Sequence, residues 1–164
     1  MQRRTLLGAT GVSLLAGCGF QLWQAPNFAF NSIVVAAPPS SSFANELRRS
    51  IAASGQVQVL QPVQIETAQV ILDLVSEQRE KVVVGLNATG QVREFLLRTR
   101  MKFKLRTPKG KELIPETEIL QQRDISFNEA AVLSKEAEES LLYRDMQSDI
   151  VQQLMRRLAA LKTL

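Results

Sequence analysis

The sequence predicts an α+β fold, a two-layer domain in which one mixed sheet of about four strands is covered on one face by two helices. Three observations support it: a short apolar strand precedes an amphipathic helix, three strand-like segments follow with short turns between them, and a long amphipathic helix ends the chain. A helical crossover allows its flanking strands to lie parallel, whereas short turns make the later strands antiparallel. Two helices can then bury the apolar face of the sheet while its other face stays polar.

The first strand and helix are marked by their boundaries. Residues 33–36 are an apolar run that stops before two prolines. Serines that follow the prolines supply cap residues for the helix, and Gly55 is a suitable stop at its C-terminal end. The buried stripe of this helix is predicted to be Phe43, Leu47 and Ile51. Residues 57–64 are ambiguous, because their alternation is short and Pro62 interrupts it.

Three longer strands are predicted at residues 69–86, 92–106 and 112–125, with turns at 87–90 and 108–110. The middle strand has the clearest alternation, with mostly apolar side chains at odd positions and cations at even positions. The cations, called here the basic row, are Arg98, Arg100, Lys102, Lys104 and Arg106. Because successive side chains of a strand point to opposite faces, the basic row should lie on the polar face of the sheet.

The last helix is predicted to run from a capping box at residues 126–129 to about Lys162. Ser126 at the cap and Glu129 three residues later match the capping-box pattern. Apolar residues then recur at three- and four-residue spacing, which predicts a stripe that packs on the sheet. The stripe consists of Leu142, Met146, Ile150, Leu154, Leu158 and Leu161.

The N-terminus has the features of an export signal. Two arginines precede an apolar, uncharged run of 13 residues, which is shorter than the roughly 20 residues of a helix that crosses a bilayer. The sequence Leu15-Ala16-Gly17-Cys18 then resembles a bacterial lipobox. This resemblance implies that Cys18 receives a diacylglyceryl thioether, becomes the mature N-terminus and is N-acylated. Two or three acyl chains on one residue give stable membrane attachment.

The predicted organisation therefore has three parts: a lipoprotein signal peptide at residues 1–17, an acylated tether at 18–31 and a single α+β domain at 32–164. Gly19 follows the cysteine where aspartate commonly retains lipoproteins at the inner membrane, so by analogy we expect attachment to the outer membrane. The arginine pair leaves both general secretory and twin-arginine export open.

Composition argues against most kinds of enzyme. The chain has no histidine, and its single cysteine is assigned to the lipid. The sequence contains no P-loop, dinucleotide-binding glycine motif or Gly-x-Ser-x-Gly elbow. Residues 1–17 hold two arginines and no acid, so the remaining 147 residues carry 18 basic and 16 acidic side chains. We therefore predict a protein that is not an enzyme and that binds no cofactor, no metal and no nucleic acid.

Two basic features are candidates for anion binding. The basic row suits phosphate or carboxylate groups, because arginine binds them through a bidentate fork. Its cations can instead pair with acids of the flanking strands, and both interpretations stay open. The available acids are Asp73, Glu77, Glu112, Glu116 and Glu118. Lys135, in the first part of the last helix, presents the same choice, because Glu138 and Glu139 are close in sequence.

Several motifs in order resemble the LPS-assembly lipoproteins of the LptE family. They are Cys18-Gly19-Phe20-Gln21-Leu22, Gly90-Gln91-Val92-Arg93-Glu94-Phe95, Arg123-Asp124-Ile125-Ser126-Phe127-Asn128 with Leu133-Ser134-Lys135-Glu136-Ala137-Glu138, and Gln153-Leu154-Met155-Arg156-Arg157-Leu158. The resemblance covers nearly the whole mature chain. It implies a small sheet covered by two helices, and a non-enzymatic outer-membrane protein that plugs and helps assemble the β-barrel LptD and binds lipopolysaccharide.

The resemblance also nominates site residues. The ligand-contacting lysine of the family corresponds to Lys135. The second basic position of the family lies near the turn before the alternating strand, where residues 86–90 carry no cation, so Arg93 or the basic row is its candidate substitute. The resulting lipopolysaccharide-binding candidates are Lys135, Arg93, Arg98, Arg100 and Lys102.

Two other functions remain open. One is a lipoprotein adaptor of another envelope complex, such as a barrel-assembly complex. The other is an envelope hydrolase that uses serine and lysine, which would require these two residue types to meet in a pocket of the fold.

Overall fold

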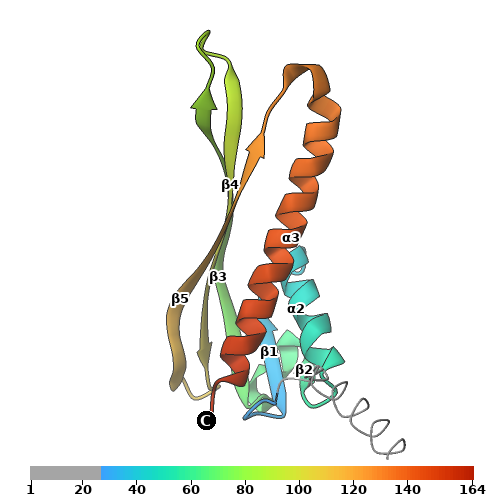
Figure 1. The fold of residues 1–164 in the computed structure, drawn as a ribbon. Coiled ribbons are helices and arrows are strands. Elements are labelled where there is room, and N and C mark those ends of the chain that lie inside the picture. The colour runs from blue at the N-terminus through green and yellow to red at the C-terminus, as the bar shows by residue number, and fades with distance from the viewer. Residues whose placement is uncertain (1–26) are drawn as a thin grey trace, which may run out of the picture.

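Five strands form one mixed sheet in the computed structural model, which describes residues 27–164 (Figure 1). The strands are β1 (Ser32–Ala36), β2 (Gln58–Leu60), β3 (Val70–Leu86), β4 (Val92–Arg106) and β5 (Glu112–Ser126), in the order β2-β1-β3-β4-β5. β1 is parallel to β2 and β3, whereas β3, β4 and β5 are antiparallel. The predicted fold class is confirmed, and the ambiguous segment around Pro62 supplies the fifth strand, β2, and a 3-10 helix at Pro62–Thr67.

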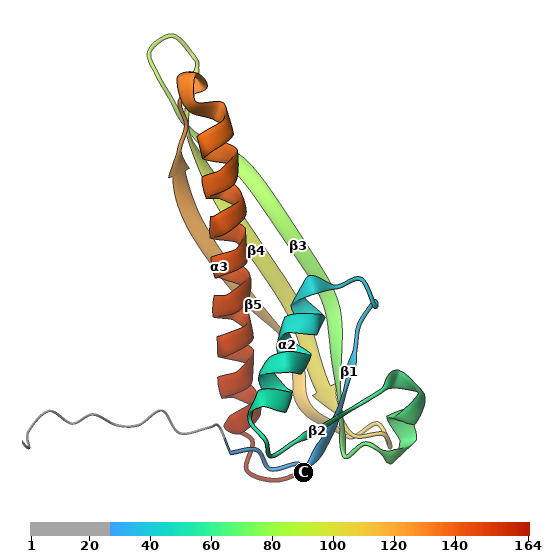
Figure 2. The same cartoon turned by 90° about the vertical axis from the view of Figure 1, so that its right-hand side faces the viewer.

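Two α-helices cover the same face of the sheet (Figures 1 and 2). They are α2 (Ser42–Ala53) and α3 (Val132–Ala159). The Ser41 hydroxyl caps α2 by accepting a hydrogen bond from the Ala44 N–H at 3.1 Å, and Gly55 follows α2 with a φ of 71°. A positive φ favours glycine, so the predicted stop is confirmed. α3 ends at Ala159, short of the predicted Lys162.

The predicted capping box at the start of the last helix is wrong. Ser126 is the final residue of β5 and pairs with Glu94 of β4, so it stays in the strand ladder instead of capping a helix. The cap residue is Asn128, whose side chain accepts a hydrogen bond from the Ala130 N–H at 3.0 Å. It starts a short 3-10 turn, and α3 begins only at Val132.

The main core lies between the sheet and both helices, at the end of the molecule that we call the base. The predicted stripe of α2 is buried there, with Ile150, Leu154 and Leu158 of the predicted α3 stripe, and so are Met101, Phe103 and Leu105 of β4. Leu142 and Leu161, the two ends of the predicted α3 stripe, are only partly buried. The alternation of β4 is confirmed, because its odd residues from Leu97 onward are buried and the basic row lies on the opposite face. Phe28, near the start of the described chain, also joins this core.

The opposite end of the molecule, the tip, is more thinly packed. β3 pairs with β1 only over Val70–Asp73, and beyond this point the sheet consists of β3, β4 and β5 alone (Figure 2). All buried residues of α3 lie between Met146 and Leu158, so none of residues 132–145 is buried. A small second cluster of Leu97, Ile125 and Met146 lies next to this half of α3, whose partly buried Leu142 and Tyr143 pack against it. Within residues 27–164, no helix is both long and apolar enough to cross a membrane.

Candidate functional site

The basic row forms cross-strand ion pairs on the face of the sheet away from the helices. The pairs join Arg106 to Asp73 (2.7 Å), Arg100 to Glu118 (3.4 Å) and Arg98 to Glu80 (3.8 Å). Arg106 donates two hydrogen bonds to Asp73, which raise the pKa of its guanidinium above its usual value. In residues 27–164 neither Lys102 nor Lys104 forms an ion pair. The arginines of the row therefore contribute to sheet pairing, and the two lysines are its unpaired charges.

Lys135 lies on the other side of the sheet, on the first turns of α3. Its Nζ lies 2.8 Å from a carboxylate oxygen of Glu138 and 3.0 Å from the hydroxyl of Ser126, and its side chain is 21% exposed. Serine and lysine therefore meet, as the hydrolase interpretation requires. However, the Lys135 Nζ donates hydrogen bonds to the Ser126 hydroxyl and to the Glu138 carboxylate, whereas a lysine that activates serine must accept the proton of the hydroxyl. The contact consequently has the chemistry of a charged anchor rather than of a nucleophile with its base.

Arg93 lies on the same side as Lys135, near the tip. It occupies an odd position of β4, in alternation with Phe95 and Leu97, and its backbone carbonyl accepts a hydrogen bond from the Phe127 N–H at 2.7 Å. Its side chain is exposed and lines a shallow cavity with Asn128. The structure thus divides the predicted site residues into two groups. Lys135 and Arg93 lie on the helix side of the sheet, and Arg98, Arg100 and Lys102 lie on the opposite side.

An apolar cavity of about 210 Å³ opens between the start of α3 and the sheet, with Lys135 on its rim. It is lined by Lys81, Phe95, Ile125, Ser126, Phe127, Val132, Lys135, Glu136 and Glu139. Phe95 and Phe127 meet edge to face, with ring centroids 5.3 Å apart. Lys81 approaches from β3, and its Nζ lies 4.3 Å from the centroid of the Phe95 ring. Aromatic side chains and two lysines from separate elements therefore surround one opening.

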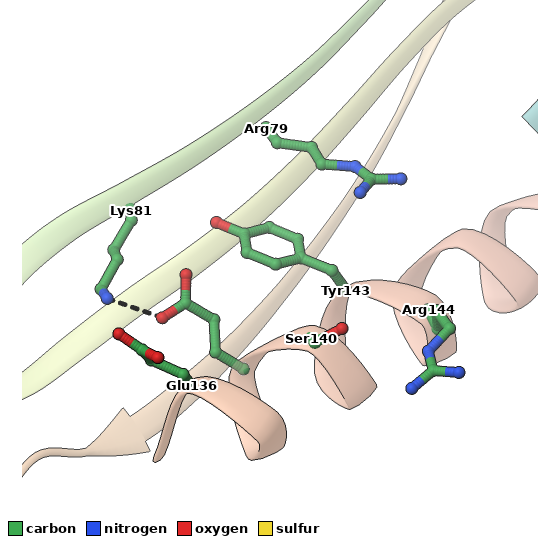
Figure 3. A pocket seen from close by; sticks show the side chains of 7 residues that line it. Arg79, Lys81, Glu136, Ser140, Tyr143 and Arg144 are labelled. Atoms are coloured by element: carbon green, nitrogen blue, oxygen red, sulfur yellow. Dashed lines mark hydrogen bonds and ion pairs between the residues drawn. The ribbon is translucent and has the colours of Figure 1, made fainter. Parts of the chain in front are cut away.

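A second hollow, the polar cleft, continues from the apolar cavity along α3 (Figure 3). It has a volume of about 450 Å³ and is lined by Arg79, Lys81, Glu136, Glu139, Ser140, Tyr143 and Arg144. Lys81 is paired with Glu139 at 2.6 Å, and both residues line both hollows. The Arg79 guanidinium lies 5.5 Å from the centroid of the Tyr143 ring. Burial raises the pKa of Tyr143, and the Glu139 carboxylate adds to the rise.

The position of Arg79 is fixed by a polar network around Gln147, one of the few buried polar residues among residues 27–164. The amide oxygen of Gln147 accepts hydrogen bonds from Arg79 (2.9 Å) and from the Ser42 hydroxyl (2.9 Å). Its amide nitrogen donates to the Glu46 carboxylate at 2.6 Å. One side chain of α3 therefore ties α2 and β3 together at the lower end of the polar cleft.

The residues of the polar cleft could not be predicted from the sequence, and a bulge in β3 is the reason. Before the bulge Leu72 and Leu74 face the helices, whereas after the shift between Leu74 and Ser76 the helix-facing residues are odd-numbered and include Arg79 and Lys81. Strict alternation would place these two cations with Asp73 on the polar face. Only the register with β4, in which Lys81 is opposite Leu97, reveals their side.

Known proteins resemble this chain in sequence and fold. The model of a lipopolysaccharide-assembly family, LptE, matches residues 30–158. The solved structure of an uncharacterized lipoprotein B from Nitrosomonas europaea is 34% identical, with a TM-score of 0.75 over 87% of this chain and 91% of that chain. The rare lipoprotein B of Shewanella oneidensis is 19% identical, with a TM-score of 0.66 over 79% and 95% of the two chains, and shares the fold. No curated protein sequence matches the chain.

Proposed function

Because the chain belongs to the LptE family of lipopolysaccharide-assembly proteins, we propose that it is an outer-membrane lipoprotein that binds lipopolysaccharide and plugs the lumen of an LptD-type β-barrel. The lipid would be attached at Cys18, which lies outside the described residues. The function is binding rather than catalysis, and no cofactor is required for it.

The observation that carries the ligand role is the position of Lys135. This lysine lines an apolar cavity together with a second lysine, Lys81, and lies on the same side of the sheet as Arg93. Lysine and arginine form charge-assisted hydrogen bonds with phosphate oxygens, and lipopolysaccharide carries phosphates on acylated sugars. We assign Lys135 and Arg93 to the ligand. The basic row lies on the other face, so one phosphate cannot contact both groups.

The barrel-plugging role is supported by the ion pairs on the sheet face that carries the basic row. Its ion pairs leave a surface of neutralised charges along β3, β4 and β5, with Lys102 and Lys104 unpaired within the described chain. Such a surface is suited to the polar interior of a large β-barrel, which is lined by polar side chains. We therefore assign the sheet face with the basic row to the barrel wall.

Separate charge reversals test the ligand role. Lys135→Glu and Arg98→Glu change the net charge equally, but on opposite faces of the sheet. A hydrogen bond to a charged group contributes about 1.5–3 kcal/mol, so Lys135→Glu should weaken lipopolysaccharide binding by roughly ten- to a hundredfold at low salt. Arg98→Glu should change the dissociation constant by less than about twofold, because only screened long-range charge is altered. Wild-type affinity in Lys135→Glu would reject the ligand role of this lysine.

The serine in contact with Lys135 separates binding from hydrolysis. Ser126→Ala removes the only hydroxyl that contacts Lys135 in residues 27–164 but leaves its charge and its pair with Glu138. Lipopolysaccharide binding and delivery to the cell surface should therefore persist in Ser126→Ala. Loss of delivery with unchanged binding would favour the hydrolase.

Co-purification tests the barrel role. The full-length protein, affinity-tagged and recovered from detergent-solubilised membranes, should bring down an LptD-type β-barrel as its largest partner. Recovery of a different envelope complex in its place would support the adaptor function and refute the proposed plug.

A further inference from the structure

The apolar cavity beneath the first turns of α3 has a lining that phosphate binding does not explain. Its walls include Phe95, Ile125, Phe127 and Val132, whereas a site for phosphate alone would need only the cations on its rim. We propose that this cavity holds part of an acyl chain of the lipid A portion of lipopolysaccharide, while a lipid A phosphate stays at the rim. This inference rests on the proposed function, since it names the part of the ligand that enters the fold.

The cavity is open because α3 is not packed onto the sheet at this level. Residues 132–145 include none that is buried, and Val132 is 38% exposed although it lines the cavity. The Phe95 ring is part of its lining, and both the Phe127 ring and the Lys81 ammonium group lie close to it. Apolar surface that stays accessible to water next to a folded core favours an apolar guest, because its burial releases that surface from water.

Cations around the opening are available to bind an anionic guest. Four cations and the two carboxylates of Glu136 and Glu139 line the apolar cavity and the polar cleft together. The cations are Arg79, Lys81, Lys135 and Arg144. Within the described chain three of these cations have acidic partners, which are Glu77 for Arg79, Glu139 for Lys81 and Glu138 for Lys135. Arg144 forms no ion pair in residues 27–164. A phosphate beside an acyl chain would bind here by pairing with Arg144 or by replacing a carboxylate as the partner of a lysine.

The ion pair between Lys81 and Glu139 shows how the phosphate and acyl chain could enter while every lysine keeps a partner. Lys81 holds Glu139 at 2.6 Å across the opening, and both side chains are partly exposed, at 36% and 23%. A phosphate that replaces this carboxylate as the partner of Lys81 leaves Glu139 free to turn toward solvent. The exchange keeps each lysine paired, so charge does not oppose entry of the chain.

Neighbouring positions on α3 give a matched test. Val132 lines the cavity, whereas the next residue, Leu133, is 83% exposed and is absent from the lining. Val132→Trp fills the cavity, and Leu133→Trp adds the same side chain to the surface. The full-length protein in lipid nanodiscs is titrated with two probes, bisphosphorylated lipid A and the same phosphorylated disaccharide after complete deacylation.

We expect Val132→Trp to weaken lipid A binding by about tenfold or more, the loss that corresponds to about two methylene groups left in water. Leu133→Trp should change it by less than about twofold, and neither substitution should alter binding of the deacylated probe. Equal affinity of Val132→Trp and the wild type for lipid A overturns the acyl-chain site while the proposed function stands. A wild type that binds neither probe refutes lipopolysaccharide binding itself.

Photocrosslinking is a second test, which remains usable if Val132→Trp does not fold. A photoreactive phenylalanine analogue at position 132 should crosslink to radiolabelled lipid A, and the same analogue at position 133 should not. Crosslinking of equal strength at both positions would contradict a chain held inside the cavity.

Discussion

Replacement of Gln147 by leucine should destabilise the protein although leucine is apolar and similar in size. Gln147 is 8% exposed and makes three hydrogen bonds, to Ser42, to Arg79 and to Glu46. Leucine cannot reproduce any of these bonds, and it would place an apolar side chain against a carboxylate. The polar network that joins α2, β3 and α3 would therefore lose its centre.

The expected magnitude follows from the partners that remain. One neutral and two charge-assisted hydrogen bonds amount to about 4–7 kcal/mol if all are lost without replacement. Ser42 and Arg79 are exposed, however, and can bond to water, and Glu46 keeps a hydrogen bond of 2.7 Å from Ser148. We therefore expect the free energy of unfolding to fall by about 2–3 kcal/mol, the cost of leaving part of a buried network unsatisfied.

Urea unfolding of the full-length protein in detergent, followed by circular dichroism, measures this loss. With a dependence of about 2 kcal/mol per molar urea, the midpoint should fall by roughly 1–1.5 M. The matched control is Gln152→Leu, the same change at an exposed position of α3, which should stay within about 0.5 kcal/mol of the wild type. If Gln147→Leu also stays within that range, the network contributes nothing to stability and the reasoning is refuted.

Two further predictions concern charge. Tyr143 is the only tyrosine of the chain, so an ultraviolet titration of phenolate should give a pKa above the usual value of about 10, and Glu139→Gln should lower it again. Because the folded pKa exceeds the unfolded one, this group stabilises the fold below about pH 10 and less above it; a midpoint at or below 10 would contradict the burial argument. Asp73→Asn removes the partner of Arg106 and should cost about 1 kcal/mol in urea unfolding, whereas Glu80→Gln, whose oxygen is 3.8 Å from its arginine, should cost close to nothing. Equal losses for the two variants would show that pair geometry does not matter here.

The segments that the sequence predicted well are those in which one face is buried without interruption. In β4 every second residue from Leu97 to Leu105 is buried, so the two-residue alternation of apolar side chains predicts both the strand and which of its faces is buried. The stripe of α3 from Met146 to Leu158 does the same at helical spacing. β2 could not be predicted in this way, because its three residues are held by pairing with β1 rather than by a pattern of their own.

The candidate site was less predictable, because it depends on register. Lys135 could be nominated from a local motif, but its neighbours Lys81 and Arg79 reach the helix side only through the bulge at Val75, which a single strand does not reveal. The predicted start of α3 was wrong for a related reason, because β5 pairs with β4 as far as Ser126, so this residue belongs to the strand. In both cases the pairing of strands in the sheet overrides the structure that the local sequence pattern predicts.

The short contact between β1 and β3 distributes mechanical stiffness unevenly along the molecule. At the base, four residues of β3 pair with the parallel strand β1. From there to the hairpin, β3 is an edge strand that pairs with β4 alone. Local opening should therefore need least free energy at the tip and most at the base, where Phe28 and Phe30 are buried in the main core. The molecule should thus deform most easily at the tip, near the proposed lipopolysaccharide site, and least at the base.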